Sequence, residues 1–252
     1  MALSPGDRIA QWEVMRFLGR GGMGEVYLVR HFRIKETVLA LKVLSRKWMD
    51  HAQVRGRFHR EGAVMARFEH AHIVRVFSAG AEHEERRNLD YILMEYVQGS
   101  TLDKVLQEQR RGEPLDFHAV LEFSSHVAKA LAYAHSQDPP VVHRDVKPSN
   151  IMIADPTSDY PVGRAVVMDW GIAKELKEAD EAPLTEVWTV VGTPQYCAPE
   201  QMRPFDQVQA SADIYSLGMV IYEMCLSISP MATAACAARA AWRSISESSR
   251  LW

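Results

Sequence analysis

The chain has 252 residues, of which 47% are apolar and 24% are charged, and its formal net charge is −3. This length suits one large domain or two small ones with a substantial core, and the slightly acidic balance argues against a strongly basic nucleic-acid binder. No apolar run approaches the roughly 18 residues that span a bilayer, and residues 1–10 lack the apolar core of a signal peptide.

Three cysteines are present, Cys197, Cys225 and Cys236, and none belongs to a C-x-x-C pair. Their odd number and wide spacing argue against a disulfide scaffold and against a zinc site built from cysteines. We therefore expect a cytoplasmic protein without a membrane segment.

The first part of the chain, from about residue 9 to residue 97, contains short runs of β-branched and aromatic residues. These runs predict strands over residues 25–29, 37–44 and 91–94. One helical pattern interrupts them, because five residues recur at spacings typical of one helix face. They are Val54, Phe58, Glu61, Met65 and Phe68.

The second part, from about residue 101 to residue 226, has a mainly helical pattern. One continuous apolar stripe predicts a helix, and it consists of Val120, Phe123, Val127, Ala130, Leu131 and Ala134. Small strands are predicted at residues 151–153 and 165–168, and a second apolar helix at about residues 212–225. The joint between the two parts is expected near residues 97–100.

A glycine-rich segment runs from Gly19 to Gly24 and matches the pattern G-x-G-x-x-G. Alone, this pattern suits an ordinary flexible hairpin as well as a nucleotide site. A dinucleotide-binding fingerprint requires a helix after the glycines, whereas residues 25–29 favour a strand. We therefore predict a strand–turn–strand hairpin, in which glycines let backbone N–H groups approach phosphates closely.

A lysine and a glutamate are predicted to meet. Val38, Ala40 and Lys42 share one face of a strand, which leaves room for a flat base beside a cation. In isolation Lys42 also suits a solvated strand edge. Glu61, however, lies on the apolar stripe of its helix, and an inward carboxylate needs a partner. Lys42 is the expected partner of Glu61.

The segment from His143 to Asn150 is a polar loop between two strand-like runs, Val141–Val142 and residues 151–153. Within six residues it offers a carboxylate, an amine and an amide. These groups can deprotonate a hydroxyl, neutralise a phosphoryl group and ligate a hard cation. Asp169 supplies a second hard oxygen ligand at the end of the predicted strand 165–168.

These motifs follow one another in the order found in eukaryotic-type (Hanks-type) serine/threonine protein kinases of bacteria. They are the glycine loop, residues 40–42, Glu61, and residues 143–150, 169–171, 198–200 and 213–218. The chain therefore resembles this family over about residues 9–226. The resemblance implies an α+β, bilobal fold with a small β-rich N-lobe (about 9–97) and a mainly helical C-lobe (about 101–226).

The resemblance also implies roles for individual residues. Asp145 would accept the proton of the substrate hydroxyl, Lys147 would steady the γ-phosphate, and Glu61 would brace Lys42. Asn150 and Asp169 would bind the metal, which is Mg²⁺ with Mn²⁺ as an alternative. ATP would be held by Leu18, Gly19, Gly21, Gly22, Gly24, Val26, Ala40, Lys42, Met94, Glu95, Val97 and Met152.

Regulation is also implied by the resemblance. Arg144 would meet a phosphate on the activation segment, residues 169–200, where Thr185 and Thr189 are the better candidates for autophosphorylation. Thr193 would face Asp145 and favours Ser or Thr of proteins as the phosphoryl acceptor. Dimerisation for autophosphorylation fits this signalling role.

Trp170 departs from the family pattern, because it stands where Phe is usual. We expect it to pack against Met65 and His143 in the same way. The C-terminus departs more strongly, because the recognisable pattern fades after about Cys225 and the last helices of the C-lobe are missing. Residues 227–252 form an atypical Ala/Ser-rich tail, compatible with a substitute helix, with disorder, or with a shifted or truncated reading frame.

This tail contains no arginine that matches the usual partner of Glu200. Arg239, Arg243 and Arg250 lie in segments without a counterpart in the family. A buried Glu200 without its cation would cost several kcal/mol.

Three functions are therefore weighed. An active ATP-dependent serine/threonine protein kinase is implied directly, since every catalytic position is filled. A nucleotide-binding but inactive fragment or pseudokinase, acting as a binding module, is the alternative that the tail favours. A small-molecule phosphotransferase is a third reading, against which the peptide platform of residues 192–200 argues.

Overall fold

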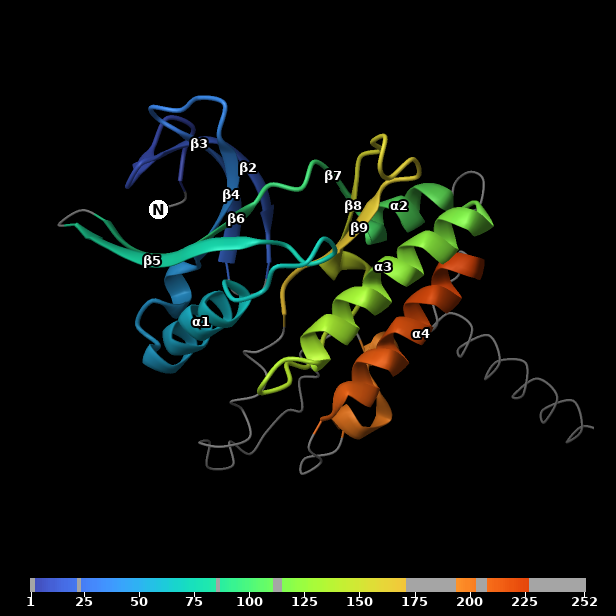
Figure 1. Ribbon diagram of the computed structural model, residues 1–252. Coiled ribbons are helices and arrows are strands. Elements are labelled where there is room, and N and C mark those ends of the chain that lie inside the picture. Colours follow the sequence, from blue (N-terminus) through green and yellow to red (C-terminus); the bar gives the residue numbers. More distant parts are fainter. Residues whose placement is uncertain are drawn as a thin grey trace, which may run out of the picture.

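The computed structural model describes residues 3–21, 24–84, 87–110, 115–170, 194–202 and 208–226. These residues form a small lobe built on a sheet and a second lobe built mainly of helices (Figure 1). The predicted α+β class and the bilobal arrangement are thereby confirmed. The tail 227–252 lies outside the described residues.

The small lobe contains a six-stranded sheet in the order β1-β2-β3-β4-β6-β5, in which all neighbours are antiparallel. Its strands are β1 (Arg8–Ile9), β2 (Trp12–Arg20), β3 (Gly24–His31), β4 (Val38–Leu44), β5 (Val76–Glu84) and β6 (Arg87–Glu95). Predicted strands 25–29 and 91–94 are confirmed as parts of β3 and β6, and predicted strand 37–44 is confirmed as β4, which begins one residue later.

The glycine-rich segment joins β2 to β3 as the predicted hairpin, with Arg20 opposite Glu25. Gly24 begins β3 at a close approach to β4, where an added Cβ would lie 2.1 Å from the carbonyl oxygen of Val43. Glycine is therefore required at this position for the two strands to pair.

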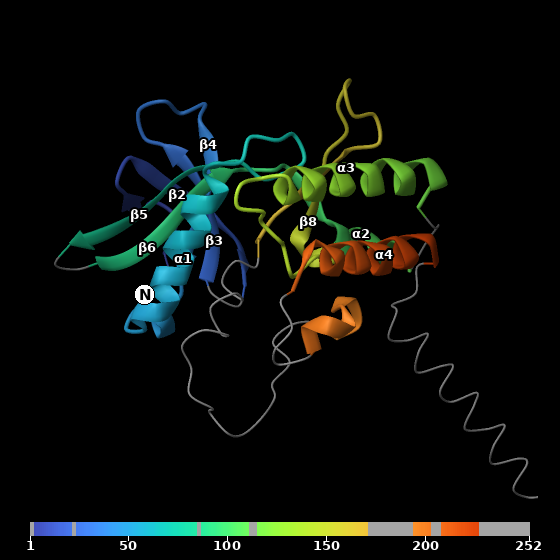
Figure 2. The ribbon, with the colours of Figure 1, turned by 60° about the horizontal axis from the view of Figure 1, so that its bottom comes forward.

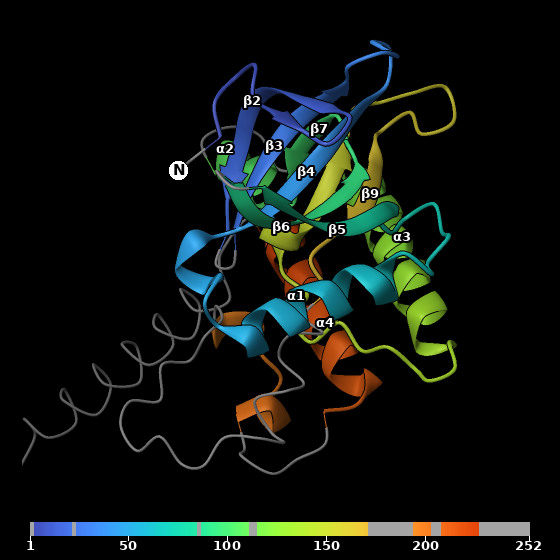
Figure 3. The same ribbon diagram turned by 90° about the vertical axis from the view of Figure 1, so that its left-hand side faces the viewer.

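One helix of this lobe, α1 (Ala52–Met65), lies under the sheet along β5 and β6 (Figure 3). It buries Phe58, Glu61 and Met65 of the predicted stripe, whereas Val54 is half-buried. Phe68 is buried as well, but it follows the end of the helix.

The second lobe contains the helices α2 (Leu102–Gln109), α3 (Phe117–His135) and α4 (Ala210–Leu226), with α3 and α4 packed side by side (Figure 2). A three-stranded sheet of β7 (Gly99–Thr101), β8 (Ile151–Ala154) and β9 (Arg164–Val167) packs on α3 through β9 and on α2 through β7 and β8. Short 3-10 turns lie at Arg46–Trp48, Pro148–Asn150, Pro194–Tyr196 and Pro199–Met202.

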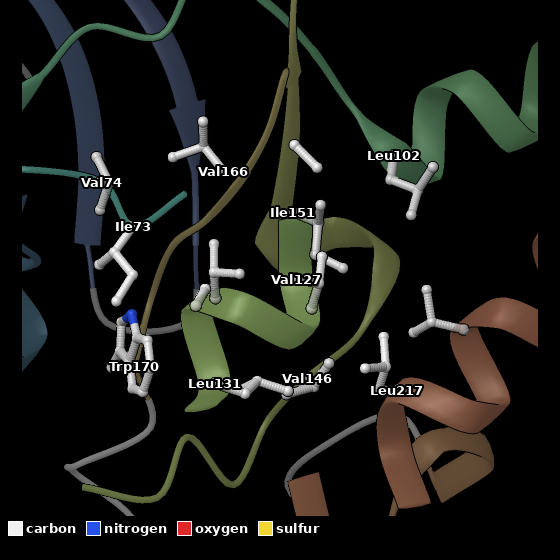
Figure 4. Close-up of a cluster of buried hydrophobic side chains, with 14 of the residues drawn as sticks. Ile73, Val74, Leu102, Val127, Leu131, Val146, Ile151, Val166, Trp170 and Leu217 are labelled. Atoms are coloured by element: carbon white, nitrogen blue, oxygen red, sulfur yellow. The ribbon is translucent and has the colours of Figure 1, made fainter. Parts of the chain in front are cut away.

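The buried face of α3 is the predicted apolar stripe, since all six of its residues are at most 3% exposed. The stripe packs against β9, α4 and the segment around Val146, as the cluster in Figure 4 shows. Ile73 forms a parallel bridge with Val167, so the segment before β5 is joined to the sheet of the second lobe. The site residues of both lobes are therefore attached to one continuous core.

One strand-like run was wrongly predicted. Val141 and Val142 lie in an irregular segment that follows the end of α3. The backbone N–H of Val141 bonds instead to the carbonyl of Ala134, so this segment closes the helix end. β-Branched residues favour a strand only where a neighbouring strand can pair with them.

Within the described part of the chain, no helix is long and apolar enough to cross a membrane.

Acid is expected to destabilise this fold through a buried histidine pair. His72 and His126 stack at 4.0 Å between ring centroids and are 6% and 4% exposed. Burial lowers the pKa of His72 to about 4 and also lowers the pKa of His126. The unfolded chain therefore binds more protons than the folded chain between about pH 6.5 and pH 4, and stability falls as the pH falls through this range.

Thermal melts between pH 7.5 and pH 5 measure this loss. His72→Asn should reduce the slope of melting temperature against pH, because it removes one group that takes up a proton on unfolding. An unchanged slope in this variant would contradict the assignment to His72.

Candidate active site

The predicted partnership of Lys42 and Glu61 is present where α1 meets the sheet. Lys42 Nζ lies 3.0 Å from Glu61 Oε1 and 2.8 Å from Asp169 Oδ1. One amine therefore joins β4 of the small lobe, α1 and the segment that follows β9. Lys42 and Glu61 are only 12% and 9% exposed at their side chains, while Asp169 is 51% exposed.

Electrostatics keep this cluster charged. Burial disfavours the charged form of Lys42, but the carboxylates of Asp169 and Glu61 outweigh it and raise the pKa of the amine. The same amine lowers the pKa of Asp169. Burial raises the pKa of Glu61 against the opposing effect of Lys42. An anionic phosphate placed here would meet a permanently charged lysine.

The polar loop presents its three functional groups together. Lys147 Nζ lies 2.8 Å from Asp145 Oδ2, and Asn150 Nδ2 donates to the same carboxylate oxygen at 3.0 Å. Asn150 also donates to the backbone carbonyl of Asp145. These contacts fix the direction of the Asp145 carboxylate.

The loop is tied directly to the segment that carries Asp169. The backbone N–H of Met168 donates to the carbonyl of Asn150 at 2.9 Å. The His143 ring nitrogen Nε2 lies 3.0 Å from the carbonyl of Met168. These bonds hold together the two residues predicted as metal ligands, Asn150 and Asp169.

Asp213 of α4 anchors the beginning of the loop. Its carboxylate is fully buried and accepts the backbone N–H groups of His143 and Arg144 at 2.7 Å each. It also lies 2.8 Å from His135 Nε2 of α3. Arg144 has a φ of 64°, a left-handed conformation that non-glycine residues rarely adopt and that these bonds hold in place.

The predicted adenine-binding residues occupy the underside of the sheet and the connection between the lobes. Gly19, Val26 and Lys42 are successive partners across β2, β3 and β4, and Ala40 is paired with Met94 of β6. Leu18 lies near the end of β2, and Gly21 and Gly24 flank the hairpin turn. Gly22 lies outside the described residues.

The connection between the lobes is fixed at both of its ends. Glu95 at the end of β6 forms an ion pair with Arg164 of β9 at 2.7 Å, and its backbone N–H bonds to the carbonyl of Arg75. At the other end, the carbonyl of Gln98 accepts the N–H of Asp155. Val97 between them is 7% exposed, and Met152 of β8 is half-buried.

Trp170 occupies the core directly after Asp169. It is fully buried, and its ring centroid lies 4.8 Å from that of His143 and 5.3 Å from that of Phe68 (Figure 4). The expected packing on His143 is confirmed, and Met65 belongs to the same buried cluster. The indole therefore fills the place of a smaller aromatic ring, although its N–H meets no partner among the described residues.

Several predicted features fall on residues that the structure leaves undescribed. They are Gly171, Thr185, Thr189 and Thr193 of the activation segment and Arg239, Arg243 and Arg250 of the tail. Glu200 is half-buried rather than buried, and it forms no ion pair with another described residue.

Three structural roles were missed from the sequence. The anchoring bonds of Asp213, the ion pair of Arg164 and the buried carboxylate of Asp90 all involve partners 31 to 78 residues away. Asp90 directly precedes the predicted strand 91–94, and a charged residue that continues a buried strand was the available signal for one of them, because such a charge needs a partner.

A family model described as the protein kinase domain matches residues 12–248 of this chain. The match extends past residue 226 into residues that the structure leaves undescribed. A crystal structure of the PknI kinase domain of Mycobacterium tuberculosis is similar, with a TM-score of 0.67, 32% identity, and coverage of 91% of this chain and 78% of that one.

Two curated relatives are described as serine/threonine kinases. The probable serine/threonine-protein kinase SCO3848 of Streptomyces coelicolor is 36% identical over 220 residues, which cover 87% of this chain and 30% of that protein. The serine/threonine-protein kinase PknB of Mycobacterium leprae is 37% identical over 214 residues, which cover 85% of this chain and 32% of that protein.

The chain spans about a third of the length of these curated relatives. The family model nevertheless matches most of this chain, including every described residue of the site. The chain therefore belongs to the protein kinase domain family and is a Hanks-type bacterial member of it.

Proposed function

We propose that this chain is an ATP-dependent serine/threonine protein kinase that transfers the γ-phosphoryl group of ATP to hydroxyl groups of proteins. The observation that carries the proposal is the convergence of two clusters, Lys42–Glu61–Asp169 and Asp145–Lys147–Asn150, on the segment around Met168. Together they supply a phosphate-binding cation, two hard oxygen ligands and a carboxylate base.

The chemistry follows from these groups. Asp145 accepts the proton of the substrate hydroxyl. The hydroxyl oxygen bonds to the γ-phosphorus of ATP, and the bond between the γ-phosphorus and the ADP oxygen breaks. Lys147 stands beside this carboxylate and donates to an oxygen of the transferring group. Lys42, braced by Glu61, holds the α- and β-phosphates. Positioning and charge neutralisation therefore provide most of the rate.

The metal site fits a magnesium ion. The amide nitrogen of Asn150 donates to Asp145, which leaves the amide oxygen as the group that would bind a cation, and Asp169 offers a half-exposed carboxylate. Hard oxygen donors of this kind suit Mg²⁺, with Mn²⁺ as the alternative. When bound, the ion would neutralise the negative charge of the phosphate groups.

Regulation and context belong to the same proposal. Arg144 would receive a phosphate on Thr185 or Thr189, placed there by autophosphorylation within a dimer. The substrates would be cytoplasmic proteins with accessible Ser or Thr, and nucleic acid would not be a ligand.

Magnesium-ATP should stabilise the chain and allow phosphoryl transfer. At 100 times its dissociation constant, a ligand that binds only the folded chain adds about 2.7 kcal/mol, or about 5–10 °C in melting temperature. We expect this rise together with phosphate incorporation on Ser and Thr but not on Tyr, measured by thermal melts and phosphoamino-acid analysis.

The two measurements separate the alternatives. A thermal shift without transfer would identify a nucleotide-binding pseudokinase, and transfer to a small molecule alone would identify a phosphotransferase. If Mg-ATP caused neither a thermal shift nor phosphoryl transfer, the proposal would be overturned. ATP without Mg²⁺ serves as the control.

A further inference from the structure

Asp90 is a fully buried carboxylate that the proposed chemistry does not use. It lies in β6, and Arg55 Nε of α1 donates to its Oδ2 at 2.7 Å. His59 Nε2 of the same helix lies 3.0 Å from Oδ1. Burial acts to raise the pKa of Asp90, but the bonds from Arg55 and His59 outweigh it and lower this pKa. The carboxylate is therefore ionised at neutral pH and engaged by α1 on both oxygens.

The pairing of the sheet places Asp90 and Lys42 on the same face. Lys42 is opposite Ile92 in the antiparallel pair of β4 and β6, and Asp90 lies two residues before Ile92. Side chains two residues apart in a strand, and side chains opposite each other in a pair, point to the same face. α1 covers this face (Figure 3).

The helix therefore carries two polar attachments to the sheet, and the Arg55–Asp90 ion pair has the opposite polarity to the Glu61–Lys42 ion pair. In its first half, Arg55 and the His59 ring bind the sheet anion Asp90, and further along, the helix anion Glu61 binds the sheet cation Lys42. Directly after Glu61 the helix backbone comes close to the sheet at Gly62, where an added Cβ would lie 2.7 Å from the Cβ of Ala79.

Two attachments determine where Glu61 lies. Arg55 and His59 are four residues apart and share one face of the helix, so a carboxylate bound by both limits rotation and sliding of the helix. One residue of helical rotation is about 100°, which would turn the Glu61 carboxylate away from Lys42.

We propose that Asp90 is a positioning residue, which holds α1 through Arg55 and His59 so that Glu61 braces Lys42 for phosphoryl transfer. This inference rests on the proposed kinase activity for its rate effects. Asp90 acts only through Glu61 and touches neither nucleotide nor substrate.

The central test is a double-mutant comparison of Asp90→Asn with Glu61→Gln. Asp90→Asn should lower kcat about 10-fold, since small misplacements of catalytic groups have effects of this size or larger. If Asp90 acts through Glu61, it should cause no further loss in the Glu61→Gln background. A loss of equal factor in both backgrounds would overturn the inference, since an independent structural role is additive.

Glu13→Gln is the matched control. It removes an ion pair from the same sheet, between Glu13 of β2 and Arg30 of β3 at 3.1 Å, and should leave kcat unchanged. Arg55→Met breaks the same ion pair from the side of α1, at a side chain that is 33% exposed. It should reproduce the loss of kcat even if Asp90→Asn fails to fold.

A measurement without catalysis tests the position of α1 directly. An amine-reactive acetyl ester should label Lys42 faster in Asp90→Asn and in Glu61→Gln than in the wild type, with exposed Lys104 as the internal reference. Unchanged labelling in Asp90→Asn, when Glu61→Gln raises it, would overturn the inference. If the wild-type chain showed no phosphoryl transfer, the proposed function would be rejected. The labelling of Lys42 would still decide whether Asp90 positions α1.

Discussion

Replacing Asp145 by Asn is expected to reduce phosphoryl transfer about 10²- to 10⁴-fold, the range in which a positioned general base contributes. Asn keeps the shape of the side chain but cannot accept the proton of the substrate hydroxyl. It also removes the negative partner of Lys147, whose Nζ lies 2.8 Å from the Asp145 carboxylate. The loss should fall on kcat, measured with radiolabelled ATP and a Ser- and Thr-containing substrate.

Nucleotide binding should survive this substitution. Lys42, proposed to hold the phosphates, bonds to Glu61 and Asp169. Of the two proposed metal ligands, Asn150 does bond to the Asp145 carboxylate, but its second bond, to the backbone carbonyl of Asp145, does not involve the substituted group. The thermal shift caused by Mg-ATP should therefore remain close to that of the wild type. Asp155→Asn, at an exposed position of the same lobe, is the matched control and should retain full activity. Wild-type transfer by Asp145→Asn would refute the role of this carboxylate.

The parts of the fold that the sequence predicts well are those with a local signal. The hairpin of the glycine-rich segment follows from residues 25–29, which are adjacent in the chain and pair with β2. The α3 helix follows from an apolar stripe that is buried along its whole length. In both cases neighbouring residues decide the structure, so the pattern alone is sufficient.

The Lys42–Glu61 pair shows how far such reasoning extends into the site. Each residue broke a local rule, because a charged side chain lay on a face that had to be buried. Two inward-facing side chains of opposite charge are therefore predicted to be partners, and the ion pair between Lys42 and Glu61 at 3.0 Å confirms this prediction. The third member, Asp169, was recognised as a metal ligand but not as a partner of Lys42.

The long-range supports could not be predicted in this way. The bonds from Asp213 to His143 and Arg144 span about 70 residues, and they depend on how α4 packs beneath the loop. The attachment of Asp90 to α1 depends on the register of β4 and β6. Both are consequences of tertiary packing, and no local pattern in the sequence identifies the partners of these two carboxylates.

The largest loss of stability is expected from Asp213→Ala. This change removes the acceptor of two backbone N–H groups, the buried one of His143 and the partly buried one of Arg144. An unsatisfied buried group costs about 1–3 kcal/mol and the partly buried one costs less, so we expect the free energy of unfolding to fall by about 2–4 kcal/mol. A typical domain has only about 5–15 kcal/mol in total. Urea denaturation measures the change.

The same substitution should also lower activity in chains that remain folded. Arg144 keeps its left-handed conformation through the bond to Asp213, and Asp145 is the next residue, so release of Arg144 displaces the catalytic carboxylate. Asp213→Asn keeps one acceptor oxygen and should lose about half as much stability. Ser216→Ala removes a single hydroxyl from the same helix and should cost about 1 kcal/mol. If Asp213→Ala cost no more than Ser216→Ala, then Asp213 would not be the anchor of the catalytic loop.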